Sequence, residues 1–383
     1  MASNLNIFIF TRDLRLYDNT TLMHAMTYGK IIPVFIFTPE QIKHNKYRSE
    51  RAIQFMLECL DDLEKQIRKR GGKLYYFYGK PHHVIKQVIR DNASTVESNV
   101  RIFMNKDYTP YARERVRKLS EICEVVELDD YKLSDPTTYE RDVYKVFSPF
   151  YKVVSKKRVR RPVIHASIKF TKLKIYKHYK VDKEIFRKPV NKLLTGGRTE
   201  GLRRLAHLNH LTTSSLASPL EQSSMLSPYL KFNVLSVREV YYVMKKLSSS
   251  TRHTLIRSLY WRDFYMQLGL PSYRYKIKSG SRAKRVFTQW KQGRTGVPII
   301  DRLMIELRET GYLHNRSRMI VANYLARRCD WKLGERYFAQ QLTDYDPCSN
   351  NGGWRYVASV GPDSMPPYRS FNPERQEKKY YKQ

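Results

Sequence analysis

Three serines stand just ahead of a predicted helix in the second half of the chain. Ser223 and Ser224 precede Leu226, Ser227 and Pro228. Small hydroxyls and main-chain N–H groups in front of a helix can surround a phosphate without burying an uncompensated cation. The same residues also fit an ordinary helix start that is capped by serine. On its own the segment is therefore a candidate phosphate site with a structural alternative.

The cysteines give no sign of metal or disulfide chemistry. The chain has four, Cys59, Cys123, Cys329 and Cys348, and no two of them have CxxC spacing. No Cys/His cluster has the spacing of a metal site. We expect reduced thiols in an intracellular protein and no bound metal.

The charge of the chain favours a polyanionic partner. Its 383 residues contain 71 Lys and Arg against 36 Asp and Glu, a formal net charge of +35. Nucleic acid is the first candidate, an anionic membrane the second, and a merely well-solvated surface the structural alternative. The N-terminal apolar run is too short for a signal peptide, and no stretch is long enough to span a membrane. We expect a soluble protein without a membrane partner.

The first ~130 residues alternate between strand and helix patterns. Short apolar runs that predict strands occur at Leu5–Phe10, Ile31–Phe37, Leu74–Tyr78, Arg101–Met104 and Val125–Leu128. The segments Glu50–Arg70 and Pro110–Ile122 between them are long enough for crossover helices. This alternation predicts an α/β domain with a doubly wound parallel sheet over residues 1–130.

The rest of the chain predicts a connector and then an all-helical domain. Residues 131–195 lose clear periodicity and carry a basic run at Lys156–Arg161. From residue 196 to 383 the patterns are helical, with one helix between Pro298 and Gly311 and another over His314–Arg328. The polar ending after Pro373 predicts a loose tail.

Several segments resemble the DNA photolyase and cryptochrome family, in family order. The N-terminal ones are Phe10–Asn19, Tyr144–Phe150 and Gly196–Glu200. The later ones are Ser223–Phe232, Tyr260–Tyr265, Trp290–Asp301, His314–Met319, Asp344–Asp346 and Asn350–Trp354. The resemblance covers nearly the whole chain and is densest from Ser223 onward. His314-Asn315-Arg316 makes the chain most similar to class I-type cyclobutane pyrimidine dimer photolyases.

The resemblance implies FAD as cofactor and assigns roles by matched position. FAD would be held by Ser223, Ser224, Leu226, Ser227, Arg262, Arg318, Asp344, Asp346 and Asn350. Asn350 would face flavin N5, and Trp354 and Trp331 would belong to the chain that photoreduces the flavin. The lesion pocket would be lined by Trp261, Asn315, Arg316, Met319, Tyr356 and Ser258. An extruded dimer needs such a flat wall with hydrogen-bonding groups.

The chain departs from the family at several of these positions. Ser258 stands where dimer photolyases usually have Glu, and Tyr356 where bacterial ones have a second pocket Trp. The distal Trp of the photoreduction chain is missing, with Tyr273 or Tyr275 as candidate terminal donors. Asn233 replaces the usual Gly after Phe232. Folate is disfavoured as antenna, which leaves deazaflavin, another flavin or no antenna.

The hypothesis that follows is an enzyme, a deoxyribodipyrimidine photo-lyase. It would split cyclobutane pyrimidine dimers in DNA by light-driven electron transfer from reduced FAD, as a monomer. The alternatives are a cryptochrome-like blue-light photoreceptor without repair, and a DNA-binding relic with impaired catalysis. Nucleus, cytoplasm and a viral compartment remain equally open as locations.

Overall fold

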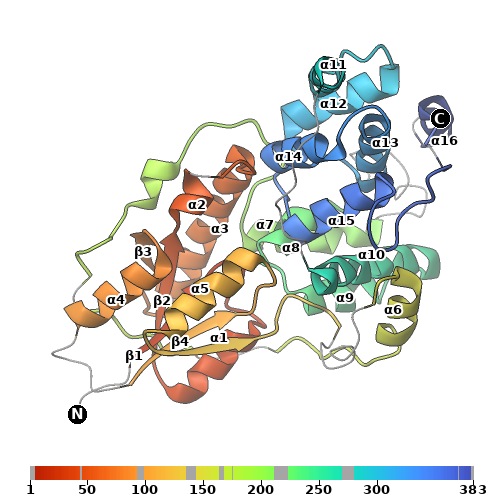
Figure 1. Ribbon diagram of the computed structural model, residues 1–383. Helices are drawn as coiled ribbons and strands as arrows, with labels where there is room; N and C mark the ends of the chain where they lie inside the picture. The colour runs from red at the N-terminus through yellow and green to blue at the C-terminus, as the bar shows by residue number, and fades with distance from the viewer. Residues whose placement is uncertain are drawn as a thin grey trace.

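The computed structural model describes residues 5–43, 45–92, 99–134, 144–163, 168–174, 176–210, 223–269, 280–369 and 371–380 (Figure 1). Its N-terminal half contains a parallel sheet with the strand order β3-β2-β1-β4-β5. The strands are β1 (Leu5–Phe10), β2 (Ile31–Phe37), β3 (Tyr75–Tyr78), β4 (Val100–Asn105) and β5 (Glu124–Leu128). Each predicted strand is therefore present, within one residue at either end. The predicted fold class is confirmed.

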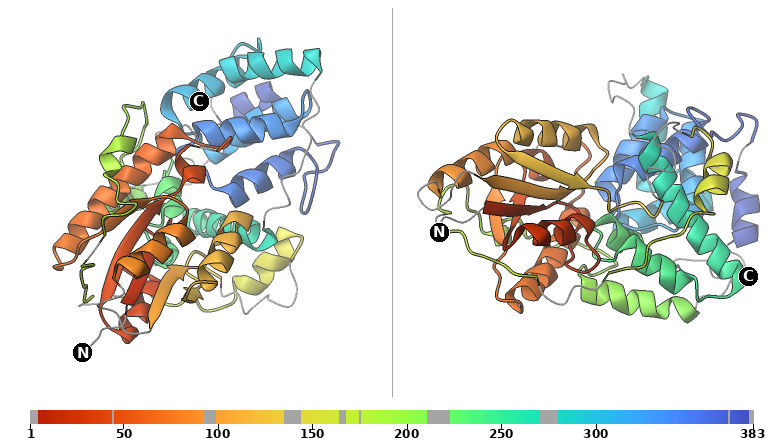
Figure 2. Two further views of the ribbon diagram at one scale, coloured as in Figure 1. Left: turned by 60° about the vertical axis from the view of Figure 1, so that its left-hand side comes forward. Right: turned by 90° about the horizontal axis from the view of Figure 1, so that it is seen from below.

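Helices cover both faces of this sheet (Figure 2). Along β1, Phe8 and Phe10 pack with α1 (Thr20–Ala25) and α3 (Glu50–Arg68). Ile7 and Ile9 point the other way, toward α4 (Pro81–Asp91) and α5 (Pro110–Ser120). Alternate side chains of a strand point to opposite faces, so a strand buried on both sides must be apolar throughout. That is why these strands appear as unbroken apolar runs in the sequence.

The connector contains more regular structure than its sequence predicts. Helix α6 spans Phe147–Val154 and buries Phe147, Phe150 and Val154, while a 3-10 turn, η4, spans Lys183–Phe186. The expectation that helical structure fades here is wrong, because these apolar residues, three and four apart, pack on the helical half.

The C-terminal half is helical throughout its described part. Its elements are α7 (Arg198–Ala206), η5 (His207–His210), α8 (Ser227–Lys231), α9 (Val237–Met244), α10 (Ser249–Leu268), α11 (Ser281–Gln292), α12 (Pro298–Thr310), α13 (Asn315–Ala326), α14 (Trp331–Gln341), α15 (Pro347–Val357) and α16 (Pro373–Tyr380). The expected loose tail is wrong, because α16 packs on α12 and α13, where Arg302 lies 3.5 Å from Glu377.

The two halves meet at the carboxyl edge of the sheet. Asp18 and Asp130, in loops after β1 and β5, are fully buried. Arg238 of α9 pairs with both carboxylates at 2.7 Å, and Arg15 pairs with Asp130 at 2.6 Å. Burial alone would raise the pKa of Asp130, but the two guanidinium groups hold it well below its ordinary value. We call these four residues the junction cluster. The motif at Phe10–Asn19 thus serves largely to join the two halves.

Candidate functional site

The serine segment lies beside a buried ion pair. The Ser223 hydroxyl is 3.1 Å from the Tyr312 hydroxyl, and the Tyr312 ring lies under the Arg318 guanidinium. Arg318 pairs with Asp344 at 2.7 Å. Tyr312 therefore connects the candidate phosphate segment to Arg318 and Asp344. Sequence reasoning missed Tyr312, although it stands two residues before His314.

The side chain of Asn350 has a defined orientation. Its Nδ2 donates to the main-chain oxygen of Glu335 at 3.0 Å. A carbonyl oxygen only accepts, so the amide nitrogen must face it and the Asn350 oxygen faces elsewhere. The Glu335 carboxyl is also hydrogen-bonded by Asn351 and by Tyr47 from the α/β half. Burial raises the pKa of Glu335 to about 7 despite these bonds.

Asp346 is tied to the α/β half. Arg12, which follows β1, donates to Asp346 at 2.6 Å and to Asp107 at 3.1 Å. The other Asp346 oxygen caps α15 by accepting from the Ser349 N–H. Burial would raise the pKa of Asp346, but Arg12 and then Lys231 hold it well below its usual range. This carboxylate therefore stays charged and in place.

Arg262 is held by main-chain oxygens and by Asn233. It donates to the carbonyls of Tyr131 and Leu230 and to the Asn233 side chain. Asn233 has a φ of 45°, in the left-handed region. Glycine adopts this conformation freely, and Asn is among the few other residues that tolerate it. Asn233 in place of Gly therefore keeps the backbone conformation and adds a hydrogen-bond acceptor for Arg262.

An aromatic wall connects α6, α10 and α15. Trp261 stacks on Phe147, with ring centroids 3.7 Å apart and planes within 5°. Tyr265 lies 5.5 Å from Trp261 and also neighbours Tyr356. A Cβ at Gly352 would sit 2.1 Å from the Tyr265 ring, so only glycine lets α15 approach this closely. The structure therefore packs α15, which carries Tyr356, against the Tyr265 side of this wall.

The other expected pocket residues lie on α10 and α13. Asn315 is exposed at the start of α13, and Met319 lies four residues on, on the same face. The Arg316 guanidinium lies 5.9 Å from the Phe371 ring centroid. Ser258 is exposed, and its hydroxyl donates to the Thr254 carbonyl one turn earlier at 3.1 Å.

Of the two expected electron carriers, Trp354 is the more deeply buried. It packs edge-to-face against Trp290 at 6.1 Å and Phe338 at 5.1 Å. Trp331 begins α14 and packs half-buried against the same core. Tyr273 and Tyr275 lie outside the described residues. The roles of both tryptophans in electron transfer stay predictions.

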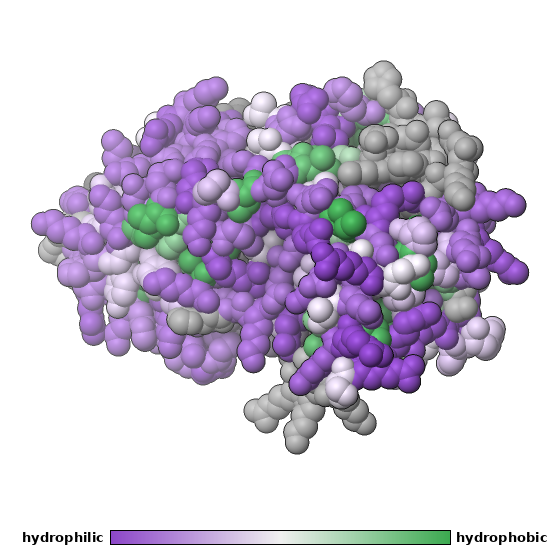
Figure 3. All heavy atoms as spheres, turned by 90° about the horizontal axis from the view of Figure 1, so that it is seen from above, coloured by the Kyte–Doolittle hydropathy of each residue, from purple (hydrophilic) through white to green (hydrophobic). Residues whose placement is uncertain are grey.

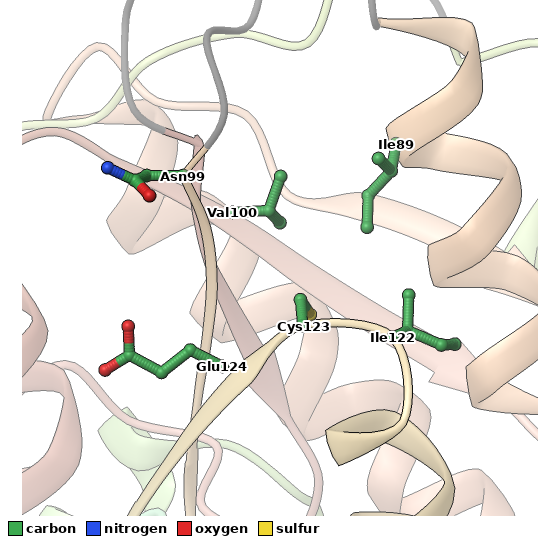
Figure 4. Close-up of a pocket in the computed structure, with 6 residues that line it drawn as sticks. All are labelled: Ile89, Asn99, Val100, Ile122, Cys123 and Glu124. Carbon is green, nitrogen blue, oxygen red and sulfur yellow. The ribbon is translucent and has the colours of Figure 1, made fainter.

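A separate pocket of about 320 Å³ lies at the opposite edge of the sheet (Figure 4). It is lined by Ile89, Asn99, Val100, Ile122, Cys123 and Glu124. These residues surround the amino ends of β4 and β5, whereas ligands of parallel sheets bind at carboxyl ends. Burial raises the pKa of the Cys123 thiol to about 11, so it stays a thiol at neutral pH. All four cysteines are free, as expected.

Two of the expected site residues have buried polar atoms that lack a hydrogen-bond partner among the described residues. They are Asp344 Oδ1, from the expected flavin site, and Trp354 Nε1, from the expected photoreduction chain. A Cβ at Gly353 would meet nothing within 4 Å, so the chain leaves open space at that point of α15. Buried polar atoms are normally paired, so these features fit a polar cofactor beside α15.

Comparisons with known proteins place this chain in a family. The family model of DNA photolyase matches residues 6–166, and the FAD binding domain of DNA photolyase matches residues 255–383. The deoxyribodipyrimidine photo-lyase of Alkalihalophilus pseudofirmus is 30% identical over 99% of this chain and 85% of its own length.

Two solved structures share the fold. The crystal structure of an archaeal photolyase from Sulfolobus tokodaii, with two FAD molecules, has a TM-score of 0.85 and 37% identity over 98% of this chain and 87% of its own. The cryptochrome of Synechocystis has a TM-score of 0.87 and 26% identity, over 99% of this chain and 87% of its own.

The fold and the two matching family models define an FAD-binding protein of the photolyase and cryptochrome class. The chain belongs to the DNA photolyase family. It is an enzyme of the photo-lyase type, and FAD is its cofactor. Across the part of the chain that the structure describes, no helix has both the length and the apolar character to cross a membrane.

Proposed function

We propose that this enzyme repairs cyclobutane pyrimidine dimers in DNA under light. The observation that supports this most is the Trp261 wall, because Phe147 backs one face of the indole at 3.7 Å and fixes its plane. A fixed, partly exposed indole can stack an extruded base, and stacking of this kind contributes about 1–3 kcal/mol per base. The exposed Asn315 amide would hydrogen-bond a pyrimidine carbonyl.

In this proposal the cofactor is held from both ends. Ser223, Ser224, Leu226 and Ser227 would surround the FAD phosphates, and Arg318 with Asp344 would flank the flavin. Bound FAD supplies an electron donor that light can excite. Asn350 would turn its oxygen toward flavin N5, because its nitrogen is engaged by Glu335. Asp346 and Arg262 would line the flavin edge, and Arg316, Met319 and Tyr356 the substrate side.

The test is light-dependent repair by the FAD-loaded protein. Blue light with a reductant should restore thymine absorbance to an irradiated oligonucleotide, and the dark control should show no change. Absence of restoration by protein with a full FAD complement would refute the proposal. Flavin photoreduction without any dimer-dependent turnover would instead support the photoreceptor alternative, which Ser258, Tyr356 and the likeness to the Synechocystis cryptochrome favour.

We further propose a flavin as antenna at the carboxyl edge of the sheet. Arg115 Nε and Nη2 and Glu40 Oε2 are buried there without a partner among the described residues. Tyr111 hydrogen-bonds Thr38 between them. The Sulfolobus tokodaii photolyase carries two FAD molecules, one of them implicated in light harvesting. Wild-type protein should release two flavins per chain on denaturation and Arg115→Ala only one. One flavin per chain in both would refute it.

A further inference from the structure

One surface of the α/β half is basic and lies away from the lesion wall. Residues 168–174 lie beside the start of β2 and residues 176–181 beside the edge strand β3, and Figure 1 shows the later part on the side away from α10 to α15. Main-chain bonds fix this segment: Ile31 N–H donates to the Lys169 oxygen at 2.9 Å, and Tyr78 N–H to the Tyr179 oxygen at 2.9 Å. The segment is therefore anchored at both ends.

Its lysines point to solvent from this fixed backbone. Ile168 and Leu173 are buried while the lysines between and after them are exposed. From the loop before β3, the Lys73 ammonium donates to the Tyr176 hydroxyl at 2.7 Å. We call the following six residues the connector surface: Lys73, Lys169, Lys172, Lys174, Lys177 and Lys180.

The connector surface is not neutralised by carboxylates. In the ranges that the structure describes, none of its six lysines forms an ion pair. A few residues further along the same connector, Lys183 pairs with Asp61 and Glu64 at 3.3 and 3.1 Å. The hydrogen bond from Lys73, followed by the charges of Lys73 and Lys180, lowers the pKa of the Tyr176 phenol. The surroundings of Tyr176 therefore favour negative charge.

We propose that the connector surface binds the phosphate backbone of a nucleic acid, at a place separate from the lesion wall. Unpaired lysines gain affinity by releasing the counterions of the phosphates, and a fixed backbone lowers the entropy lost on binding. A membrane fits less well, since the surface is not the apolar face of an amphipathic helix. Binding here requires neither FAD nor a lesion.

The test compares two variants with the same change in net charge. The first neutralises four lysines of the connector surface: Lys172→Gln, Lys174→Gln, Lys177→Gln and Lys180→Gln. The matched control neutralises four exposed cations on or just after α11: Arg282→Gln, Lys284→Gln, Arg285→Gln and Arg294→Gln. Affinity for an undamaged 40-base-pair duplex is measured by fluorescence anisotropy across a salt series. Circular dichroism and FAD content verify folding.

The connector variant should bind the undamaged duplex at least tenfold more weakly at low salt. The slope of log K against log salt should shrink by about 3–4, since each lost phosphate contact removes about 0.9. Equal losses in both variants, or no loss in the connector variant, would overturn the proposal. Binding to vesicles of phosphatidylserine and phosphatidylcholine is measured in parallel. A connector variant that loses affinity for these vesicles and keeps its affinity for the duplex would also overturn the proposal. The connector variant should repair a short lesion-bearing oligonucleotide at the wild-type rate. A wild-type protein that does not repair would contradict the proposed function and would leave the duplex-binding result as a separate test of the connector surface.

Discussion

Glu335 is a carboxyl whose proton the folded protein should retain near neutral pH. It is 2% exposed, and burial raises its pKa from 4.5 to about 7. That shift corresponds to ~3 kcal/mol against the charged form, at 1.36 kcal/mol per pH unit. Because the pKa is raised on folding, the folded state binds more protons than the unfolded state between about pH 4.5 and 7. The free energy of unfolding therefore falls by up to ~3 kcal/mol as pH rises through this window.

The substitution Glu335→Gln removes this titration and keeps the shape of the side chain. An infrared titration of the FAD-loaded wild type should show a protonated carboxyl band that disappears near pH 7, and the variant should lack it. Tyr47→Phe should move the midpoint to higher pH, because the Tyr47 hydrogen bond lowers the pKa of Glu335. Glu309→Gln, at an exposed carboxylate, is the matched control and should leave the band intact. A wild-type protein with no carboxyl titrating above pH 6 would refute the reasoning.

Three further outcomes are expected. Trp261→Ala should weaken binding to a dimer-containing oligonucleotide by about 1–3 kcal/mol, roughly 5- to 150-fold. Unchanged affinity in a competition titration would contradict the proposal that Trp261 stacks an extruded base. Asp130→Asn should lower the free energy of unfolding in urea by about 3–5 kcal/mol, because two buried guanidinium groups lose their shared carboxylate; a loss below 1 kcal/mol would count against the junction cluster. Ser258→Glu should raise the repair rate under equal illumination while Ser258→Ala leaves it unchanged, since the hydroxyl already bonds to Thr254.

The α/β half was predictable because its elements are local and strongly patterned. The apolar run at Leu5–Phe10 is β1 from end to end, and polar residues stand on both sides of it in the sequence. The tail was not predictable in the same way. Residues 373–380 are polar in sequence, and their helix depends on contacts with α12 and α13 far away in the chain.

The residues of the candidate site also differ in how far the sequence predicts them. The motifs predict that Arg318 pairs with Asp344, and the structure contains this ion pair at 2.7 Å. The role of Asn350 beside the flavin stays a prediction. Arg12 has no such signal: it stands at a variable position of its motif and meets Asp346 across 334 residues. The raised pKa of Glu335 likewise has no signal in the sequence, since it comes from burial in the folded protein, against the hydrogen bonds from Tyr47 and Asn351 that lower it.

The junction cluster also bears on how the protein is made. Asp18 and Asp130 leave the ribosome long before Arg238, which neutralises both of them. Until α9 has been synthesised, the carboxyl edge of the sheet carries two acidic groups that lack part of their charge partners, together with uncovered apolar neighbours such as Leu14. We therefore expect this edge of the α/β half to close only after α9 has emerged, when Arg238 can pair with both carboxylates.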